Sequence, residues 1–196
     1  TMDLSSLQID KSIVREDSNF TLPQEIVVTP IFIPDTENDL IFNNREFIRG
    51  FYYYLIQKLG YSDIPFHYIV TSNGEVYKGN GGGEERKINI AGIGENLIVI
   101  AYIANTNSDT FDQKSLNSLE GLLQDICNRN SIKPENITVS GVKFIRDQTV
   151  KTVNMVSKEI FGTWDKTINQ LVINVTKAYS PIPKEYNAAV TEVTLP

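Results

Sequence analysis

Apolar residues fall into several short runs that predict β-strands. Residues 24–34 (QEIVVTPIFIP) form a β-branched run, and residues 97–104 (LIVIAYIA) are almost continuously apolar, as expected of a central strand covered on both faces. Residues 66–71 and residues 75–77 flank an Asn-Gly pair, which favours the tight turn of a β-hairpin. A further short strand is expected at residues 137–140.

Three amphipathic segments predict helices between these strands. In residues 43–60, apolar side chains recur every four positions, and a terminal glycine ends the pattern. Residues 110–113 (TFDQ) have the form of a capping box, and a leucine-rich face then continues to about residue 130. The last helix is expected from its apolar residues between positions 164 and 175, and it should end before residue 180.

Strands and helices therefore alternate in the order β-α-β-β-β-α-β-α, which predicts an α/β domain built on one mostly apolar sheet. Residues 1–21 show no clear period and are expected to form an extended N-terminal leader. Residues 22–179 are expected to form the single domain. Residues 180–196 are expected to be a C-terminal linker or tail leading to other domains of a longer chain.

Composition narrows the class of protein without identifying it. Hydrophobic residues make up 41% and charged residues 21% of the 196 residues, as in ordinary soluble domains. The net charge of −6 repels nucleic acid phosphates, and no basic run in the sequence offsets it. No apolar run approaches the length of a membrane span. We therefore expect neither nucleic acid binding nor membrane insertion.

The rarest residues limit the possible chemistry most strongly. The sequence contains one His (His67) and one Cys (Cys127), which excludes an internal disulfide and any metal site that needs two imidazoles or several thiolates. Cys127 lies beside the apolar face of its predicted helix. We therefore expect a small buried side chain there rather than a nucleophile.

Residues 79–83 contain four glycines and allow two interpretations. A phosphate-binding loop would end in Gly-Lys-Ser or Gly-Lys-Thr, but here two acidic residues, Glu84 and Glu85, follow the glycines. A flexible surface loop is the interpretation that fits these residues.

Several strings of residues, in order along the chain, resemble one known family. They are residues 63–70 (DIPFHYIV), residues 73–79 (NGEVYKG), residues 91–103 and residues 132–137 (IKPENI). Their order and spacing resemble the N-acetylmuramoyl-L-alanine amidase and peptidoglycan recognition domain family over about residues 24–178. The resemblance implies an α/β fold, with a single domain and a central mixed β-sheet flanked by helices.

The resemblance also implies where the family holds its zinc ion, and this chain departs from the family there. Family members bind zinc through two His and a Cys or Asp, and the zinc polarises water or the scissile amide. The corresponding residues here are Thr29, Val142 and Met155, which do not suit a catalytic zinc site. The Tyr that many members carry at the start of the hairpin strand is Phe66, which has no hydroxyl. For His67, beside it, we expect a structural or partly exposed imidazole.

Three functions remain open on these grounds. The first is a catalytically inactive, amidase-like domain without metal or cofactor, which binds peptidoglycan fragments (muropeptides) or a protein partner in the cell envelope or outside the cell. The second is an active amidase or other cell-wall hydrolase whose acid and base are carboxylates such as Asp147 or Glu95. The third is a purely architectural domain of a larger envelope or secreted protein.

The first function predicts a vestigial groove. Its lining would consist of Thr29, Phe66, Asn96, Val142 and Met155, with His67 and Arg86 as rim contacts. Since two of the three ligand positions are apolar, we expect the groove to be partly filled by its own side chains or by residues 79–86. Glycopeptide contacts would then be weak and polar.

Overall fold

The computed structural model describes residues 1–15, 19–33, 44–105, 112–152 and 158–182 of the chain. At its centre is a five-stranded sheet in the order β3-β2-β5-β1-β6. These strands are β1 (Glu25–Ile33), β2 (Tyr68–Val70), β3 (Val76–Lys78), β5 (Leu97–Asn105) and β6 (Ile137–Val139). Strands β1, β2, β5 and β6 are parallel, whereas β3 runs antiparallel to β2. The sheet is therefore mixed, as predicted.

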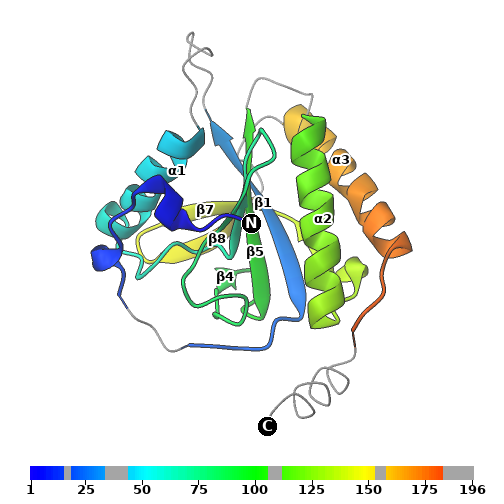
Figure 1. The fold of residues 1–196 in the computed structure, drawn as a ribbon, viewed down its shortest axis with the longest axis horizontal. Coiled ribbons are helices and arrows are strands. Elements are labelled where there is room, and N and C mark those ends of the chain that lie inside the picture. The colour runs from blue at the N-terminus through cyan, green and yellow to red at the C-terminus, as the bar shows by residue number, and fades with distance from the viewer. Residues whose placement is uncertain (16–18, 34–43, 106–111, 153–157, 183–196) are drawn as a thin grey trace.

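Helices cover both faces of this sheet (Figure 1). On one face, α1 (Asn44–Tyr53) continues into a π-helical turn (Tyr54–Lys58). On the other face, α2 (Gln113–Asn130) lies beside α3 (Lys158–Lys177). The predicted α/β architecture with one central sheet is confirmed.

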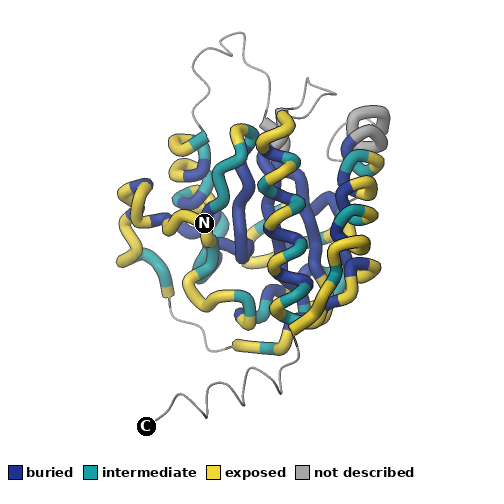
Figure 2. Tube along the Cα trace, turned by 45° about the vertical axis from the view of Figure 1, so that its right-hand side comes forward, coloured by how far each residue is buried: buried dark blue, intermediate teal, exposed yellow. Residues whose placement is uncertain are grey.

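The central strands bury side chains on both faces. In β1, Val27 and Ile31 belong to the apolar cluster beneath α1, whereas Ile26 and Val28 belong to the cluster beneath α2 and α3. We call these the α1 face and the α2 face. Figure 2 shows the resulting buried layer between the exposed outer sides of the helices.

The α2 face forms largely as the apolar periodicity predicts, apart from where its helices begin. Asp112 is the N-cap of α2, and its Oδ1 accepts a hydrogen bond from the Lys114 N–H at 2.8 Å. The predicted capping box is therefore wrong about the capping residue, and Thr110 lies outside the described residues. Helix α3 begins at Lys158, six residues before Trp164, the first apolar residue of the predicted pattern.

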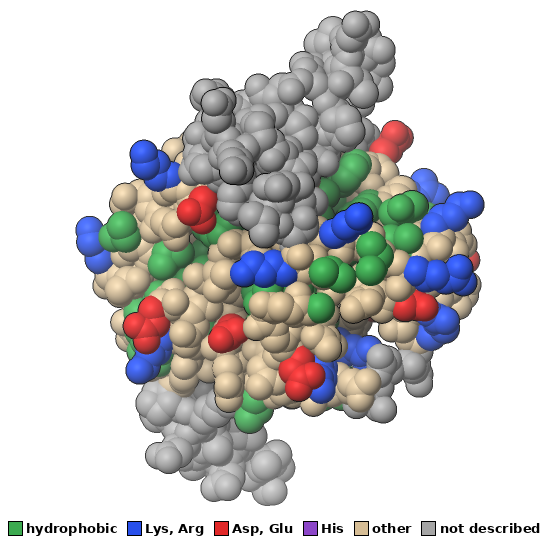
Figure 3. Space-filling model, turned by 180° about the vertical axis from the view of Figure 1, so that it is seen from behind, with side chains coloured by type: hydrophobic (Ala, Val, Ile, Leu, Met, Phe, Trp, Pro, Cys, Tyr) green, Lys and Arg blue, Asp and Glu red, His purple; other side chains and the backbone are tan. Residues whose placement is uncertain are grey.

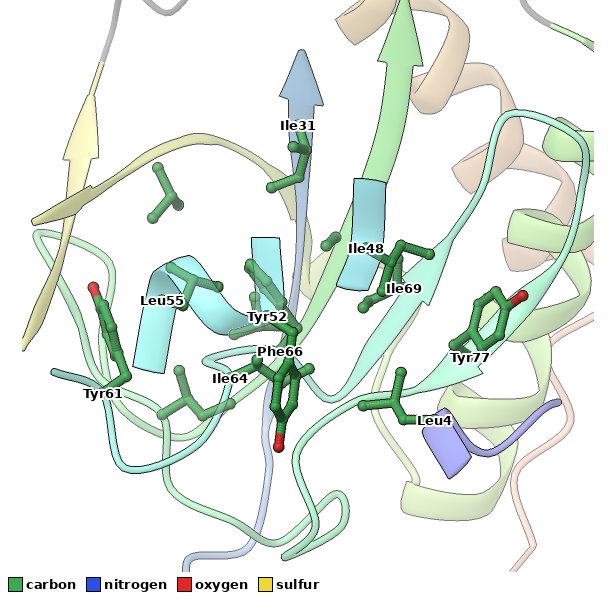
Figure 4. Packing of buried hydrophobic residues seen from close by; sticks show 14 of the residues in the cluster. Leu4, Ile31, Ile48, Tyr52, Leu55, Tyr61, Ile64, Phe66, Ile69 and Tyr77 are labelled. Carbon is green, nitrogen blue, oxygen red and sulfur yellow. The ribbon is translucent and has the colours of Figure 1, made fainter. Parts of the chain in front are cut away.

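The N-terminal segment is not the extended leader that the sequence suggested. It forms two short 3-10 helices, Leu4–Leu7 and Lys11–Ile13, each capped by an aspartate side chain. Leu4, Leu7 and Ile9 are buried in the α1 face, where Figure 4 shows Leu4 near Tyr77. The prediction failed because short 3-10 turns bury isolated apolar residues without producing a helical or strand period.

A second, three-stranded sheet was also missed, in the order β4-β8-β7. Its strands are β4 (Ile90–Ala91), β7 (Gly141–Ile145) and β8 (Gln148–Thr152). The sequence predicted no strand between residue 140 and the last helix, but β7 and β8 form a hairpin with the two-residue turn Arg146-Asp147. Asp147 adopts a positive φ of 56°, which Asp tolerates better than most residues.

Two further observations concern the helices and the chain end. None of the helices in the described ranges has the length and apolarity that a membrane crossing requires.

The first residues of the predicted tail contact α2. The Ser180 N–H donates to the Asn128 side chain at 2.9 Å, and the Ile182 N–H donates to the Asn128 carbonyl oxygen at 3.0 Å. The rest of the predicted tail, residues 183–196, lies outside the described residues.

Candidate functional site

His67 precedes β2 directly and is buried, with 3% of its surface exposed. Its Nδ1 accepts a hydrogen bond from the Val99 N–H at 2.9 Å. The proton of the neutral ring must therefore lie on Nε2, which donates to the Arg86 carbonyl oxygen at 2.8 Å. Burial lowers the pKa of His67 to about 4, so the ring is neutral at pH 7. Both ring nitrogens therefore bind backbone, which fits a structural imidazole better than a rim contact with a ligand.

Thr29 and Val142, at two of the zinc-ligand positions that the resemblance implies, are both completely buried. Thr29 pairs with Ala101 of β5 and lies on the face of β1 that α1 covers. Its hydroxyl has no hydrogen-bond partner among the described residues. Val142, the second residue of β7, belongs to the apolar cluster of the same face. Both side chains are core residues rather than the lining of an open groove. Met155 lies outside the described residues.

Phe66, at the position of the family's Tyr, lies in an aromatic cluster built from three elements. It is 1% exposed, and its ring centroid lies 5.9 Å from that of Phe51 in α1 and 5.2 Å from that of Phe144 in β7. Figure 4 shows Phe66 at the centre of the buried residues of this face, close to Tyr52 and Ile64. Side chains of the chain itself fill the space beside Phe66, as expected for the groove.

The glycine-rich loop is held against the segment that precedes β2. The Gly79 N–H donates to the His67 carbonyl oxygen at 2.9 Å, and the Gly81 N–H donates to Asp63 Oδ2 at 2.9 Å. A Cβ on Gly79 would collide with the backbone of that segment, so the close approach requires glycine. The sequence predicted a flexible surface loop here. The structure shows one fixed by hydrogen bonds on the way to Arg86.

A cavity of about 260 Å³ lies beside this loop. Its polar lining consists of Ser62, Asp63, Asn80, Arg86, Lys87, Asn89, Asp147, Gln148 and Thr149. Arg86 is only 7% exposed, so its charge lies mostly out of water. Burial raises the pKa of Asp63, although hydrogen bonds from the Gly81 and Ile64 N–H groups and, more weakly, nearby positive charges oppose that shift. A concave site with a nearly buried guanidinium is suited to an anionic group such as a carboxylate.

Asn96 does not join the other predicted site residues. Its Oδ1 accepts a hydrogen bond from the Thr21 hydroxyl at 2.8 Å, and its carbonyl oxygen accepts from the N–H groups of Gln24 and Glu25. The register of β1 and β5 places Asn96 level with Gln24, about 16 Å along the strand from Thr29 at roughly 3.3 Å per residue. The prediction that Asn96 lines a groove with Thr29 is therefore wrong. Asn96 instead holds the segment before β1 in place through these hydrogen bonds.

Comparisons with known proteins agree on one fold, although no family model matches the chain. Peptidoglycan-recognition protein SC2 of Drosophila melanogaster is 29% identical over 83 residues, which are 40% of this chain and 42% of that protein. The same protein of Drosophila simulans gives the same values. The chain therefore matches less than half the length of these relatives.

Solved structures match over a larger part of the chain. Peptidoglycan recognition protein-1 of Manduca sexta has a TM-score of 0.55 and 20% identity, with 71% of this chain and 77% of that chain covered. Peptidoglycan recognition protein-LE, solved in complex with tracheal cytotoxin (monomeric diaminopimelic acid-type peptidoglycan), has a TM-score of 0.55 and 20% identity, with 70% and 80% covered. This chain has the fold of the peptidoglycan recognition proteins.

The zinc site that the resemblance implies for this fold does not fit the residues present. One His and one Cys in the whole sequence cannot supply two His and a Cys, or two His and an Asp. His67 uses both ring nitrogens on backbone, and Cys127 is buried on the α2 face, where burial raises the pKa of its thiol to about 11. Among the described residues, no three His, Cys, Asp or Glu side chains gather as metal ligands.

The two carboxylates that the sequence suggested as acid and base lie in different surroundings. Glu95 forms an ion pair with Lys87 at 2.9 Å and does not line the cavity. Asp147 does line the cavity, at the turn of the β7–β8 hairpin, where its N–H donates to the Leu59 carbonyl oxygen at 2.8 Å. Sequence reasoning missed Asp63, and its only signal was that it opens the string of residues 63–70.

A second hollow of about 710 Å³ lies between the N-terminal segment, the β2–β3 hairpin and α2. Charged side chains in its lining bind one another: Arg129 contacts Glu84 at 2.5 Å and Asp125 at 2.9 Å. Lys11 likewise pairs with Asp3 at 3.4 Å. These side chains of the hollow are therefore already engaged in ion pairs.

Proposed function

We propose that this domain binds peptidoglycan fragments without hydrolysing them. The observation that carries the proposal is the state of His67, the single imidazole of the chain, whose two ring nitrogens both bind backbone. The burial of Thr29 and Val142 supports it, because water and a scissile amide cannot reach side chains that are completely buried. The fold itself is compatible with either a peptidoglycan-binding or an amidase-related domain.

The class of ligand is inferred from proteins of this fold and from the cavity beside Arg86. Peptidoglycan recognition protein-LE was solved with a monomeric peptidoglycan fragment bound. Such fragments carry peptide carboxylates, and a guanidinium binds a carboxylate through charge-assisted hydrogen bonds that strengthen when water is excluded. We assign the peptide stem to the cavity, with Arg86 as its main anchor.

Calorimetric titration with a soluble monomeric muropeptide tests the binding. We expect saturable binding, and Arg86→Gln should weaken it about 10- to 100-fold, the worth of one hydrogen-bonded ion pair. Arg49→Gln is the matched control, because Arg49 is exposed on α1 and does not line the cavity. If Arg86→Gln fails to fold, Lys87→Met tests the same wall from a less buried position. Wild-type protein that binds no fragment would overturn the proposal in favour of an architectural role.

Mass spectrometry of the same fragments after prolonged incubation, with and without added zinc, tests the absence of hydrolysis. We expect the fragments to remain intact in both conditions. Release of the peptide from muramic acid would contradict the proposal. Loss of that activity in Asp63→Asn or Asp147→Asn would then establish a hydrolase that uses the cavity carboxylates.

A further inference from the structure

One glycine of the glycine-rich loop lies directly against a side chain of the cavity. Gly82 is exposed, and a Cβ added to it would lie 3.0 Å from Arg86 Cβ, 3.2 Å from Arg86 Cγ and 3.1 Å from Arg86 Cδ. Carbon atoms in ordinary contact are about 3.5–4.0 Å apart. The bare backbone of Gly82 therefore packs on the aliphatic part of Arg86, in a space that no larger residue fits without moving the arginine.

The glycines on either side of Gly82 do not approach the arginine in this way. A Cβ on Gly81 would meet Asp63 Oδ2 at 3.5 Å, which is an ordinary contact, and a Cβ on Gly83 would meet no heavy atom within 4 Å. Gly83 instead has a positive φ of 75°, which glycine adopts at little cost. Within residues 81–83, close contact with the arginine is thus specific to Gly82.

Asn80 holds this part of the loop in place. Its Oδ1 accepts a hydrogen bond from the Gly82 N–H at 2.9 Å, and its carbonyl oxygen accepts from the Gly83 N–H at 3.3 Å. Its Nδ2 donates to the Ile64 carbonyl oxygen at 3.0 Å, in the segment before β2. Because the loop is tied to that segment, a methyl group added at Gly82 should displace the arginine side chain rather than the loop.

The backbone of Arg86 is fixed as well. Its carbonyl oxygen accepts from His67 Nε2 at 2.8 Å, and its N–H donates to the Gly83 carbonyl oxygen at 3.0 Å. With the backbone held, the position of the guanidinium is set by the rotamer of the side chain. Gly82 packs against three of the carbons that define this rotamer.

The surface charge of the protein gives an anionic ligand little general attraction. The net charge is −6, and, seen from behind, Lys and Arg side chains are interspersed with Asp and Glu side chains (Figure 3). Capture of a carboxylate therefore depends on local geometry more than on long-range attraction. This makes the orientation of Arg86 the property that the affinity should follow.

We propose that Gly82 is a positioning residue, whose backbone holds the Arg86 side chain in one rotamer so that the guanidinium is oriented for a carboxylate before the ligand arrives. The inference rests on the proposed function, because it concerns the anchor of the same cavity. A guanidinium binds a carboxylate through two parallel N–H groups only in a fixed orientation. A side chain that is already ordered loses little conformational freedom on binding, which favours affinity.

Calorimetric titration of Gly82→Ala with the soluble muropeptide tests the inference, and Gly81→Ala is the matched control. Neither glycine has a positive φ, so both changes affect the backbone similarly, but only Gly82→Ala adds a methyl group against Arg86. Gly82→Ala should weaken binding about 2- to 10-fold, the effect of ordering one long side chain on binding, and Gly81→Ala should leave the affinity unchanged. Equal affinities for the two variants would overturn the inference and leave the proposed function standing.

A double-mutant cycle shows whether Gly82 acts through the arginine. In the Arg86→Gln background, which lacks the guanidinium, Gly82→Ala should change the affinity by less than about 2-fold. If Arg86→Gln does not fold, Arg86→Met takes its place, because methionine keeps an unbranched aliphatic stem without the charge. Gly82→Ala that weakens binding by the same factor with and without Arg86 would mean that the methyl group blocks the ligand itself, which would overturn the inference.

The orientation of Arg86 can also be measured without a ligand. In ¹H–¹⁵N spectra, the Nε–H signal of the nearly buried Arg86 is identified by its loss in Arg86→Gln or Arg86→Met. Gly82→Ala should shift this signal, and Gly81→Ala should leave it in place. A signal that Gly82→Ala does not move would overturn the inference. If wild-type protein binds no muropeptide, the proposed function fails, and the inference fails with it whatever the spectra show.

Discussion

The two faces of the central sheet bury similar side chains but are covered in different ways. Two long helices, α2 and α3, cover the α2 face. The α1 face is covered by one helix together with the N-terminal 3-10 turns, the segment before β2 and the β7–β8 hairpin. The face assembled from separate pieces is also the one that contains Phe66 and borders the cavity through Tyr61 and Ile88. Loops tolerate sequence change better than packed helices do. Binding residues can therefore vary on the α1 face, while the two helices of the α2 face serve as scaffold.

If the α1 face is packed as tightly as the α2 face, removing a buried side chain from either face should cost similar stability. Phe66→Ala should lower the free energy of unfolding by about 3–5 kcal/mol, because it removes a buried ring that packs against Phe51 and Phe144. Leu123→Ala on the α2 face is the reference and should cost about 2–5 kcal/mol. Urea denaturation measures both. A cost below about 0.5 kcal/mol for Phe66→Ala, the level of an exposed position, would indicate an open groove.

Acid should lower the stability of the folded protein through His67. The folded protein holds the pKa of His67 at about 4, below the ordinary 6.5, so the unfolded chain takes up a proton first as the pH falls. The contribution is complete above pH 6.5 and is lost as the pH falls towards 4, by up to about 3 kcal/mol. Denaturant unfolding of wild type and His67→Gln between pH 7 and 4 isolates the contribution of His67 to the free energy of unfolding. Parallel pH profiles for the two proteins would show that His67 does not titrate in this way.

Substituting Asn96 should change stability by a smaller amount and leave ligand affinity unchanged. Asn96→Ala removes the hydrogen bond with the Thr21 hydroxyl and should cost about 1 kcal/mol of stability. Affinity for a muropeptide should not change, because Asn96 does not line the cavity. Thermal melts and titration of the same preparation measure both quantities. Weakened binding at unchanged stability would return Asn96 to the ligand site.

Gly50→Ala should give the smallest change, and in the opposite direction. The new methyl group meets no heavy atom within 4 Å among the described residues, and alanine favours the helix, so stability should rise by about 0.5–1 kcal/mol. Gly79→Ala is the contrasting control and should destabilise the protein, since its Cβ collides with backbone. A shift in the denaturation midpoint measures each change. Loss of stability in Gly50→Ala would mean that packing does require this glycine.

The same division explains which features the sequence could predict. The strands β1 and β5 and the helix α2 were recognisable because their apolar residues follow a local period, as Leu119 and Leu123 do. Buried Thr29 and Val142 were recognised only as departures from a family pattern. Their burial depends on elements brought together from distant parts of the chain.

The site could be predicted least well where its contacts span long separations. His67 bonds to the Arg86 carbonyl, 19 residues away, and to Val99, 32 residues away, which no local pattern encodes. Asp63 lines the cavity beside the glycine-rich loop, whose Gly81 N–H donates to its side chain. The N-terminal leucines and the β7–β8 hairpin were missed for the same physical reason: short elements are stabilised by what they pack against rather than by their own propensity.

The backbone of Met2 has a consequence for how the molecule behaves at its sheet edge. Its N–H donates to the Val76 carbonyl oxygen at 2.7 Å, and its carbonyl oxygen accepts from the Lys78 N–H at 2.8 Å. These two bonds occupy hydrogen-bonding groups of β3 that would otherwise offer a template to a strand from another molecule. We therefore expect Met2 to hinder edge-to-edge association of β3 with another molecule. Removing the first residues would expose both the strand edge and the apolar residues that contact Leu4, so we expect a shortened chain to aggregate more readily.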